Sequence, residues 1–98
     1  MARIDIPEIE IAKFCQQNHI RRLSLFGSVL REDFGPDSDV DVLVEFEPST
    51  RVGLRFFSLE QELSQILGRK VDLNTPNSLS RHFRERVLAE AEEIYVRA

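Results

Sequence analysis

Two aspartates, Asp39 and Asp41, stand at alternate positions at the start of an apolar run, SDVDVLVEF. Side chains alternate between the two faces of a strand, so a strand over Val40–Phe46 directs both carboxylates to the same side. Their repulsion is relieved by protonation of one acid, by solvation of both, or by a divalent cation. A bound cation is the interpretation that would support chemistry. The alternative is a pair of solvated acids that discourage aggregation at a strand edge.

A Gly-Ser pair, Gly27 and Ser28, directly follows a second apolar run, LSLF, and ten residues separate it from Asp39. A strand that ends in glycine and opens a helix presents unhindered backbone N–H groups and a hydroxyl, a combination suited to phosphate. The alternative for Ser28 is a helix N-cap with no other role. Because an acidic pair follows on the next predicted strand, the pattern favours a phosphate cradle that faces a cation site.

This order of strand, Gly-Ser, spacer and Asp-x-Asp resembles the signature of the polymerase-beta-type nucleotidyltransferase superfamily. The resemblance is closest to the minimal nucleotidyltransferases, small stand-alone prokaryotic proteins, because Arg31 completes GSxxR and Ser38 completes SDxD. It implies nucleotide-binding roles for Gly27, Ser28, Arg31 and Ser38. Arg31 stands one helical turn after Ser28, and its planar guanidinium suits triphosphate oxygens. The alternative for Arg31 is a charge on the helix surface.

A third carboxylate, Asp72, stands in a short apolar segment, KVDLN, which predicts a third strand over Lys70–Asn74. A lone aspartate in a short strand is ordinarily a surface residue, and this is the alternative. The resemblance implies instead that Asp72 joins Asp39 and Asp41 at one edge of an active cleft. The three acids are then expected to be the catalytic residues and the metal ligands.

The reaction implied by the resemblance is nucleotidyl transfer, in which an acceptor hydroxyl attacks the α-phosphorus of ATP and pyrophosphate leaves. Two divalent cations about 3.5–4 Å apart neutralise the charge at the entering and leaving oxygens. Hard oxygen ligands and phosphates favour Mg²⁺. Asp39 and Asp41 are expected to hold the metals, with Asp72 completing the acceptor-side ion. Gly27 and Ser28 are expected to hold the terminal phosphates.

The acceptor is suggested by the resemblance alone. Minimal nucleotidyltransferases of this kind are antitoxins that pair with a small helical HEPN-domain toxin and transfer AMP to one of its tyrosines. We therefore expect a protein adenylyltransferase with ATP as substrate and a HEPN toxin as partner. The two proteins could form a hetero-oligomer. Two alternatives stay open: a non-catalytic antitoxin that masks its toxin by binding, and a half-site of a small-molecule transferase of the aminoglycoside-modifying type.

The elements that must position these residues are predicted from hydrophobic periodicity. Helices are predicted over Pro7–Asn18, Ser28–Asp33, Val52–Leu67 with Gly68 as C-terminal cap, and Leu79–Val96; strands are predicted over Arg22–Phe26, Val40–Phe46 and Lys70–Asn74. The last helix is expected to turn inward Phe83, Val87, Leu88, Ala91, Ile94 and Tyr95. The short connection between the first two strands favours antiparallel pairing. We expect an α/β (α+β) fold, and the resemblance implies a small mixed sheet, here of about three strands flanked by four helices.

Composition bounds the class of protein. The chain has 98 residues, 42% hydrophobic and 31% charged, which is typical of one soluble globular domain over residues 1–98. Residues 28–50 hold seven acids and one base within a net charge of −4, which argues against non-specific nucleic-acid binding. No apolar run approaches the roughly 20 residues that cross a bilayer, and the N-terminus lacks a signal-peptide core, so we expect a cytoplasmic protein.

The remaining candidate residues are assigned to packing or to the surface. The single cysteine, Cys15, falls in a helical apolar pattern and is expected to be a buried thiol. His19 and His82 lack metal-ligand spacing with any other candidate and are expected at the surface or partly packed. An EF-hand loop beginning at Asp37 is excluded, because Val42 replaces its glycine and Pro48 its final glutamate.

Overall fold

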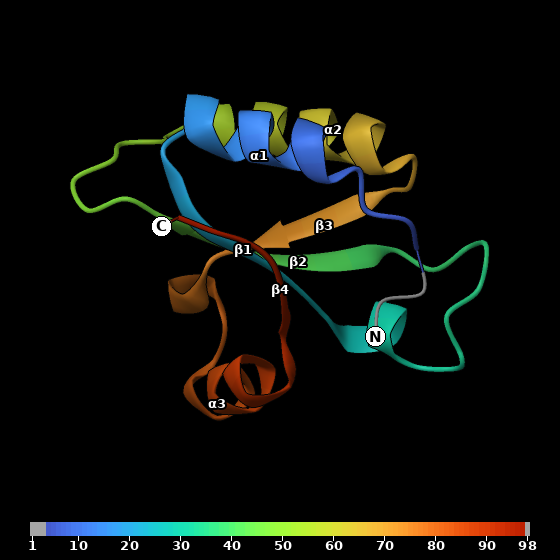
Figure 1. Ribbon diagram of the computed structural model, residues 1–98. Helices are drawn as coiled ribbons and strands as arrows, with labels where there is room; N and C mark the ends of the chain where they lie inside the picture. The colour runs from blue at the N-terminus through green and yellow to red at the C-terminus, as the bar shows by residue number, and fades with distance from the viewer. Residues whose placement is uncertain (1–3, 98) are drawn as a thin grey trace.

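The computed structural model describes residues 4–97, which form a four-stranded sheet in the order β3-β2-β1-β4. The strands are β1 (Ile20–Phe26), β2 (Val40–Phe46), β3 (Val71–Asn74) and β4 (Glu92–Val96), and the α-helices are α1 (Glu8–Gln17), α2 (Arg55–Leu67) and α3 (Arg81–Glu90). Two short 3-10 helices, η1 (Gly27–Leu30) and η2 (Pro76–Ser78), follow β1 and β3. Helices α1 and α2 lie side by side on one face of the sheet and α3 lies on the other (Figure 1). The predicted α/β (α+β) class with a mixed sheet is confirmed.

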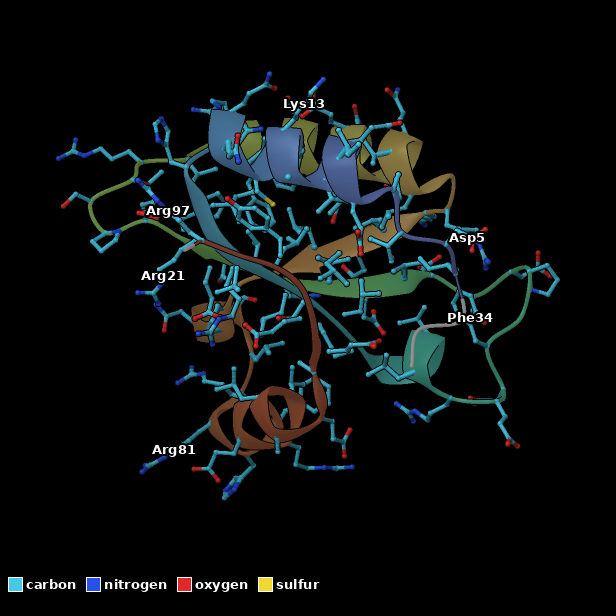
Figure 2. All side chains as sticks on the ribbon, viewed as in Figure 1. Asp5, Lys13, Arg21, Phe34, Arg81 and Arg97 are labelled. Atoms are coloured by element: carbon cyan, nitrogen blue, oxygen red, sulfur yellow. The ribbon has the colours of Figure 1, made fainter. Side chains whose placement is uncertain are left out.

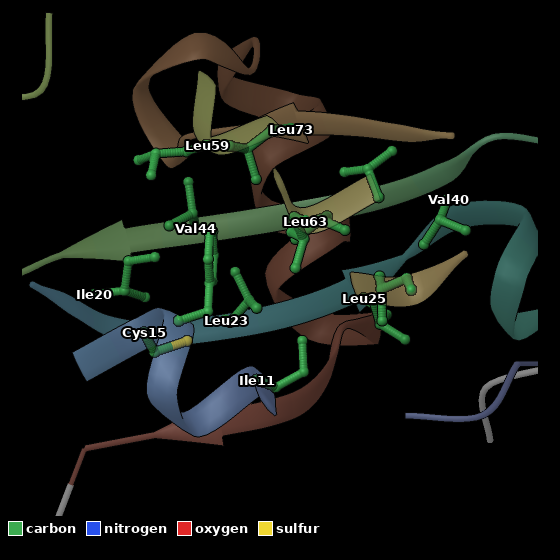
Figure 3. Close-up of a cluster of buried hydrophobic side chains, with 14 of the residues drawn as sticks. Ile11, Cys15, Ile20, Leu23, Leu25, Val40, Val44, Leu59, Leu63 and Leu73 are labelled. Carbon is green, nitrogen blue, oxygen red and sulfur yellow. The ribbon is translucent and has the colours of Figure 1, made fainter. Parts of the chain in front are cut away.

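The main core fills the space between the sheet and helices α1 and α2 (Figure 3). Alternate strand residues face it, including Leu23 and Leu25 on β1 and Val42 on β2, which are fully buried. Each such side chain contributes about 1.5–3 kcal/mol relative to exposure. Cys15 of α1 is buried in the same core, as predicted, and burial raises the pKa of its thiol to about 12.

The register of the strands decides which ends meet. Strand β1 pairs antiparallel with β2, as predicted, and β2 pairs parallel with β3 through the crossover helix α2. The C-terminal end of β1 and the N-terminal ends of β2 and β3 therefore lie at the same end of the sheet. The Gly-Ser pair and the predicted acids are all at this end.

The predicted helix over Leu79–Val96 is wrong in its second half. Helix α3 ends at Glu90, Ala91 has an extended backbone, and the chain then forms β4 against the outer edge of β1. The physical reason is that the β-branched and aromatic segment Ile94–Val96 suits a strand, and β1 supplies the backbone partners. Within residues 4–97 the sheet consequently has four strands rather than three, and there are three α-helices rather than four.

The inward face predicted for that helix is also only partly correct. Val87 is buried in a second, smaller cluster with Phe26, Leu43 and Leu79. Phe83 and Leu88, which were expected to point inward, are 46% and 48% exposed. The helix spacing placed them on the correct element, but α3 packs on the sheet along a narrow contact and leaves them at the surface.

Smaller differences concern the ends of elements. The helix predicted over Ser28–Asp33 is the 3-10 helix η1, whose N-cap is Phe26, so Ser28 is not the cap residue. Helix α2 begins at Arg55, and Gly68 ends it in the left-handed conformation, as predicted. Within residues 4–97, no helix combines the length and the apolar character that crossing a membrane requires.

Candidate active site

The predicted acids lie on the sheet face opposite the main core. Asp41 and Asp72 are direct Cα partners in the parallel pairing of β2 with β3. Their strand neighbours Val40 and Val42 are buried toward α1 and α2, so the aspartates point to the other side. Asp39 directly precedes β2 and has the same parity as Asp41. Asp39 and Asp72 are exposed, whereas Asp41 is half-buried.

The pKa of Asp41 depends on the charged residues around it. Burial raises the pKa of Asp41 above its ordinary value, the negative charges of Asp72 and Asp39 raise this pKa further, and Arg31 lowers it in part. The charges of the other two acids and of Arg31 therefore act on the Asp41 carboxyl group. Asp39, Asp72 and Arg31 are therefore near enough to Asp41 for their charges to shift its pKa.

Gly27 lies against the same carboxylate. Its predecessor, Phe26, is the Cα partner of Asp41 in the antiparallel pairing of β1 with β2. A Cβ atom on residue 27 would overlap the carboxylate of Asp41, and the φ angle of Gly27 is +77°. Glycine is thus required here twice, for the close approach and for the left-handed backbone. Ser28 follows directly in η1 and is half-buried, so it lies next to the site in the chain.

The other two predicted residues belong to the loop between η1 and β2. Arg31 is exposed, and its backbone N–H donates to the carbonyl of Ser28 at 2.9 Å. Ser38 closes a turn: its hydroxyl accepts from the N–H of Gly35 at 3.1 Å, and its own N–H donates to the Gly35 carbonyl at 3.1 Å. The Ser38 hydroxyl therefore has a structural contact, and its role in nucleotide binding stays a prediction.

Sequence reasoning did not single out Arg69, which reaches this loop from the connection between α2 and β3. Its Nη2 donates to the carbonyls of Gly35 at 2.6 Å and Ser38 at 2.9 Å. The two carbonyls are 34 and 31 residues away in sequence. A single arginine after a helix has no pattern that indicates such a partner, so only the tertiary structure identifies it.

The donor set fits a hard divalent cation. The candidate ligands are carboxylate oxygens, and in the described residues no basic side chain forms an ion pair with Asp39, Asp41 or Asp72. Burial raises the pKa of Asp41 most, the charges of Asp72 and Asp39 raise it further, and a cation would neutralise this negative charge. Within residues 4–97, no three His, Cys, Asp or Glu side chains are already drawn together as one ligand set. A bound triphosphate would supply oxygen ligands beside those of the acids.

A cavity of about 460 Å³ lies elsewhere in the molecule. It is lined by Cys15, Gln16, His19, Ile20, Tyr95 and Arg97, none of which is a predicted site residue. His19 and His82 are exposed, as expected. The cluster of acids is therefore separate from this cavity.

Comparison with known proteins agrees with the geometry of the acidic site. The sequence profile of the nucleotidyltransferase domain matches residues 8–95. The chain belongs to this family. It is 35% identical to the protein adenylyltransferase MntA of Thermococcus cleftensis, in an alignment that covers 98% of this chain and 100% of that protein.

Solved structures of this nucleotidyltransferase family share the fold. One that carries the provisional name of minimal nucleotidyltransferase has a TM-score of 0.72 and 34% identity, and the match covers 87% of this chain and 86% of that one. A chain from the complex of a tri-AMPylated Shewanella oneidensis HEPN toxin with its MNT antitoxin has a TM-score of 0.66 and 25% identity, covering 92% of this chain and 70% of that one. The resemblance to minimal nucleotidyltransferases and the assignment to an enzyme family are confirmed.

Proposed function

We propose that this nucleotidyltransferase transfers AMP from ATP to a hydroxyl group of a partner protein, with Mg²⁺ at the acidic site, and acts as an antitoxin. The observation that carries the proposal is the pairing of Asp41 with Asp72 across β2 and β3, with the Asp41 carboxylate lying against the backbone of Gly27. The relative named a protein adenylyltransferase supports AMP as the transferred group. The complex of an AMP-carrying HEPN toxin with an MNT antitoxin supports a HEPN toxin as the acceptor.

The site residues have separate tasks in this proposal. Asp39, Asp41 and Asp72 would hold Mg²⁺, which neutralises charge on the reacting phosphate and on the leaving pyrophosphate when it is bound. The backbone N–H groups and hydroxyl of Gly27 and Ser28 hold the terminal phosphates. Arg31 donates to phosphate oxygens through its planar guanidinium.

The transfer step exchanges one bond for another. The acceptor oxygen forms a bond to the α-phosphorus, the bond from that phosphorus to the bridging oxygen breaks, and pyrophosphate leaves. The acceptor proton passes to water at the exposed edge occupied by Asp72. A tyrosine is the acceptor that we propose, since a phenol with a pKa of about 10 gives up its proton far more readily than an aliphatic hydroxyl.

The partner is proposed to approach the acidic segment of this chain. Residues 28–50 carry seven acids and one base, so a basic surface on the toxin would speed and orient the encounter. AMP on a tyrosine beside a nuclease site would place a bulky anion where RNA phosphate must bind. Inhibition would then persist after the two proteins separate.

Intact-mass measurement of the HEPN partner after incubation with ATP and Mg²⁺ tests the proposal. Toxin from the wild-type reaction should gain the mass of one or more AMP groups, and toxin from the Asp41→Asn reaction should not. The toxin is then separated under denaturing conditions, refolded and assayed for nuclease activity. If toxin freed from wild-type protein is as light and as active as toxin freed from the variant, masking by binding is the better account.

A further inference from the structure

The loop between η1 and β2 connects the two halves of the site. Gly27 and Ser28 precede it, Asp39 is its last residue and Asp41 follows in β2, so its conformation sets the distance between the phosphate half and the acidic half. Five of its residues, Arg31, Glu32, Asp33, Asp37 and Asp39, have exposed charged side chains. Phe34 is the one large apolar side chain of the loop and packs against the main core, so the rest of the loop needs specific polar contacts to hold one conformation.

Arg69 supplies those contacts from outside the loop. Its Nη2 donates to two loop carbonyls, those of Gly35 at 2.6 Å and Ser38 at 2.9 Å. Its guanidinium carbon also lies 4.4 Å from the centroid of the Phe34 ring, a cation–π contact. Phe34 lies on the same side of the molecule as η1 (Figure 2). One half-buried arginine thus binds the loop by two hydrogen bonds and one stacking contact.

The loop is also tied internally and to β3. Gly35 and Ser38 exchange two hydrogen bonds that close a turn, and the N–H of Val40 donates to the carbonyl of Lys70 at 2.8 Å. Arg69 and Lys70 directly precede β3, whose second residue is Asp72. The short segment from Arg69 to Asp72 therefore connects the loop before Asp39 to the strand that carries the third acid.

We infer that Arg69 is a positioning residue for nucleotidyl transfer, which acts through the backbone of Gly35 and Ser38 to set Asp39 relative to Asp72. The inference rests on the proposed function and assigns a residue to it that contacts neither substrate. A lysine would reproduce the charge but not the planar group that reaches two carbonyls and stacks on Phe34. Arg69→Lys is therefore expected to have an effect intermediate between wild type and Arg69→Gln.

The test compares Arg69→Gln and Arg69→Lys with wild-type protein and with Arg55→Gln. Arg55 is the matched control, because it also bridges two segments, donating to Oδ1 of Asn18 at 2.8 Å, but far from the acids in the fold. Hydrogen exchange of the protein without nucleotide is measured first. Arg69→Gln should accelerate exchange in residues 31–40 and leave α1 and β1 protected, Arg69→Lys should be intermediate, and Arg55→Gln should match wild type over residues 31–40.

Transfer kinetics give the second measurement. Arg69→Gln should lower kcat by roughly 10- to 100-fold, because small displacements of reacting groups cost that much. The KM for ATP should change less than kcat, since Gly27 and Ser28 are left in place. Arg69→Lys should recover part of kcat, and Arg55→Gln should keep the wild-type values.

Two results would overturn the inference. The first is exchange in residues 31–40 and kcat that are unchanged in Arg69→Gln. The second is exchange that rises equally throughout α1 and β1 with a lower melting temperature, which would show only a global loss of stability. If wild-type protein transfers nothing, the proposed function fails by itself. Arg69 is then judged from the hydrogen exchange of residues 31–40, which Arg69→Gln should accelerate and Arg55→Gln should leave at the wild-type rate.

Discussion

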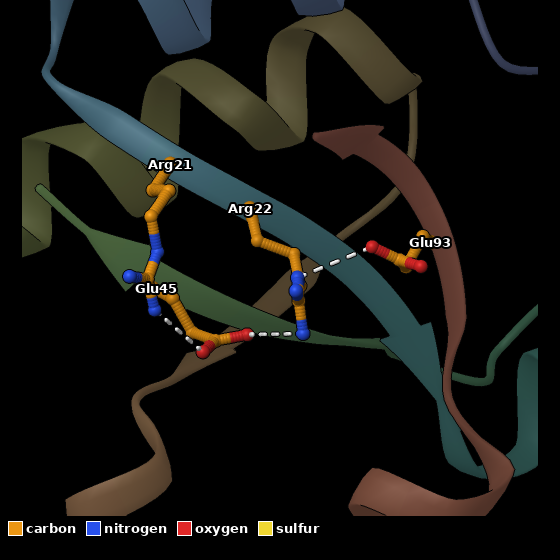
Figure 4. A network of polar contacts seen from close by, with 4 residues as sticks. All are labelled: Arg21, Arg22, Glu45 and Glu93. Carbon is orange, nitrogen blue, oxygen red and sulfur yellow. Dashed lines mark ion pairs between the residues drawn. The ribbon is translucent and has the colours of Figure 1, made fainter. Parts of the chain in front are cut away.

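The two ends of strand β2 carry acids on the same face, but within the part of the chain that the structure describes, the acid at one end forms ion pairs and the acid at the other end does not. At the C-terminal end, Glu45 forms ion pairs with Arg21 at 3.6 Å and Arg22 at 3.7 Å, and Arg22 also contacts Glu93 of β4 at 3.1 Å (Figure 4). At the N-terminal end, Asp41 lies beside Asp72, and no basic side chain within the described residues forms an ion pair with either.

Strand register is the cause of this difference. Arg22 is the Cα partner of Glu45 in the antiparallel pairing, so opposite charges face each other there. Asp41 is the Cα partner of Asp72 in the parallel pairing, so like charges face each other. The protein neutralises one end with its own side chains and leaves the other end negative. Arg31 offsets part of the negative charge at the N-terminal end, and we propose that a bound cation balances the rest.

The largest effect is expected from removing an acid at the uncompensated end. Asp39→Asn and Asp41→Asn should each lower the transfer rate by roughly 10³-fold, since loss of a metal ligand forfeits several kcal/mol of charge stabilisation. Glu45→Gln is the control on the same strand face and should transfer AMP at near the wild-type rate. AMP incorporation into the partner measures all three. Near-normal transfer by either aspartate variant would contradict the assignment of the acids.

Gly27→Ala tests the N-terminal end of β2 by placing a methyl group against the Asp41 carboxylate. The added Cβ overlaps the Asp41 carboxylate and the φ angle of +77° strains the backbone, so we expect a loss of about 2–4 kcal/mol in unfolding free energy and a transfer rate lowered roughly 10-fold or more. Gly68→Ala is matched for strain, with a φ angle of +68° and no atom within 4 Å of the new Cβ. It should cost only about 1–2 kcal/mol and preserve transfer. Equal losses in the two variants, measured by denaturant unfolding and AMP incorporation, would remove the special role of position 27.

The paired end should contribute little to stability. Glu45 is only 17% exposed, but Arg21 and Arg22 are 50% and 42% exposed and both distances are long, so Glu45→Gln should lower the unfolding free energy by about 0.2–1 kcal/mol. The loss should shrink at high salt, because exposed ion pairs are screened. Denaturant unfolding at low and high ionic strength measures this. A loss of several kcal/mol that salt leaves unchanged would show that the network is a buried structural element instead.

The smallest effect is expected on the stability of the protein without metal or nucleotide. Burial and the neighbouring acids raise the pKa of Asp41, so its charged form opposes folding above this raised pKa, and the penalty disappears as pH falls below the ordinary value of 3.8. Asp41→Asn should therefore raise the melting temperature by a few degrees at pH 7. The difference from wild type should narrow as pH falls toward 4. A lower melting temperature for the variant at pH 7 would mean that the carboxylate is stabilised by contacts rather than repelled.

Local sequence was sufficient for the features that depend on near neighbours. The alternation of strand residues placed Asp39 and Asp41 on one face, and the glycine after β1 and the glycine after α2 marked the ends of those elements. The antiparallel return of β2 was predicted from the short connection, because chain length alone excludes a crossover. These features were predictable because their causes lie within a few residues of the positions concerned.

Other features required the tertiary structure, because their causes lie far away in sequence. The apolar spacing from Phe83 to Tyr95 suits one continuous helix, and the segment Glu92–Val96 becomes a strand because its residues also suit a strand and β1 offers an unpaired edge. Asp72 was placed at the site by family resemblance, whereas its position beside Asp41 depends on the register of two strands joined by α2. The hydrogen bonds of Arg69 to the loop before Asp39 had no signal in the sequence. Long-range contacts decided all three, through backbone pairing for Glu92–Val96 and Asp72 and through side-chain hydrogen bonds for Arg69, and periodicity within one segment does not encode such contacts.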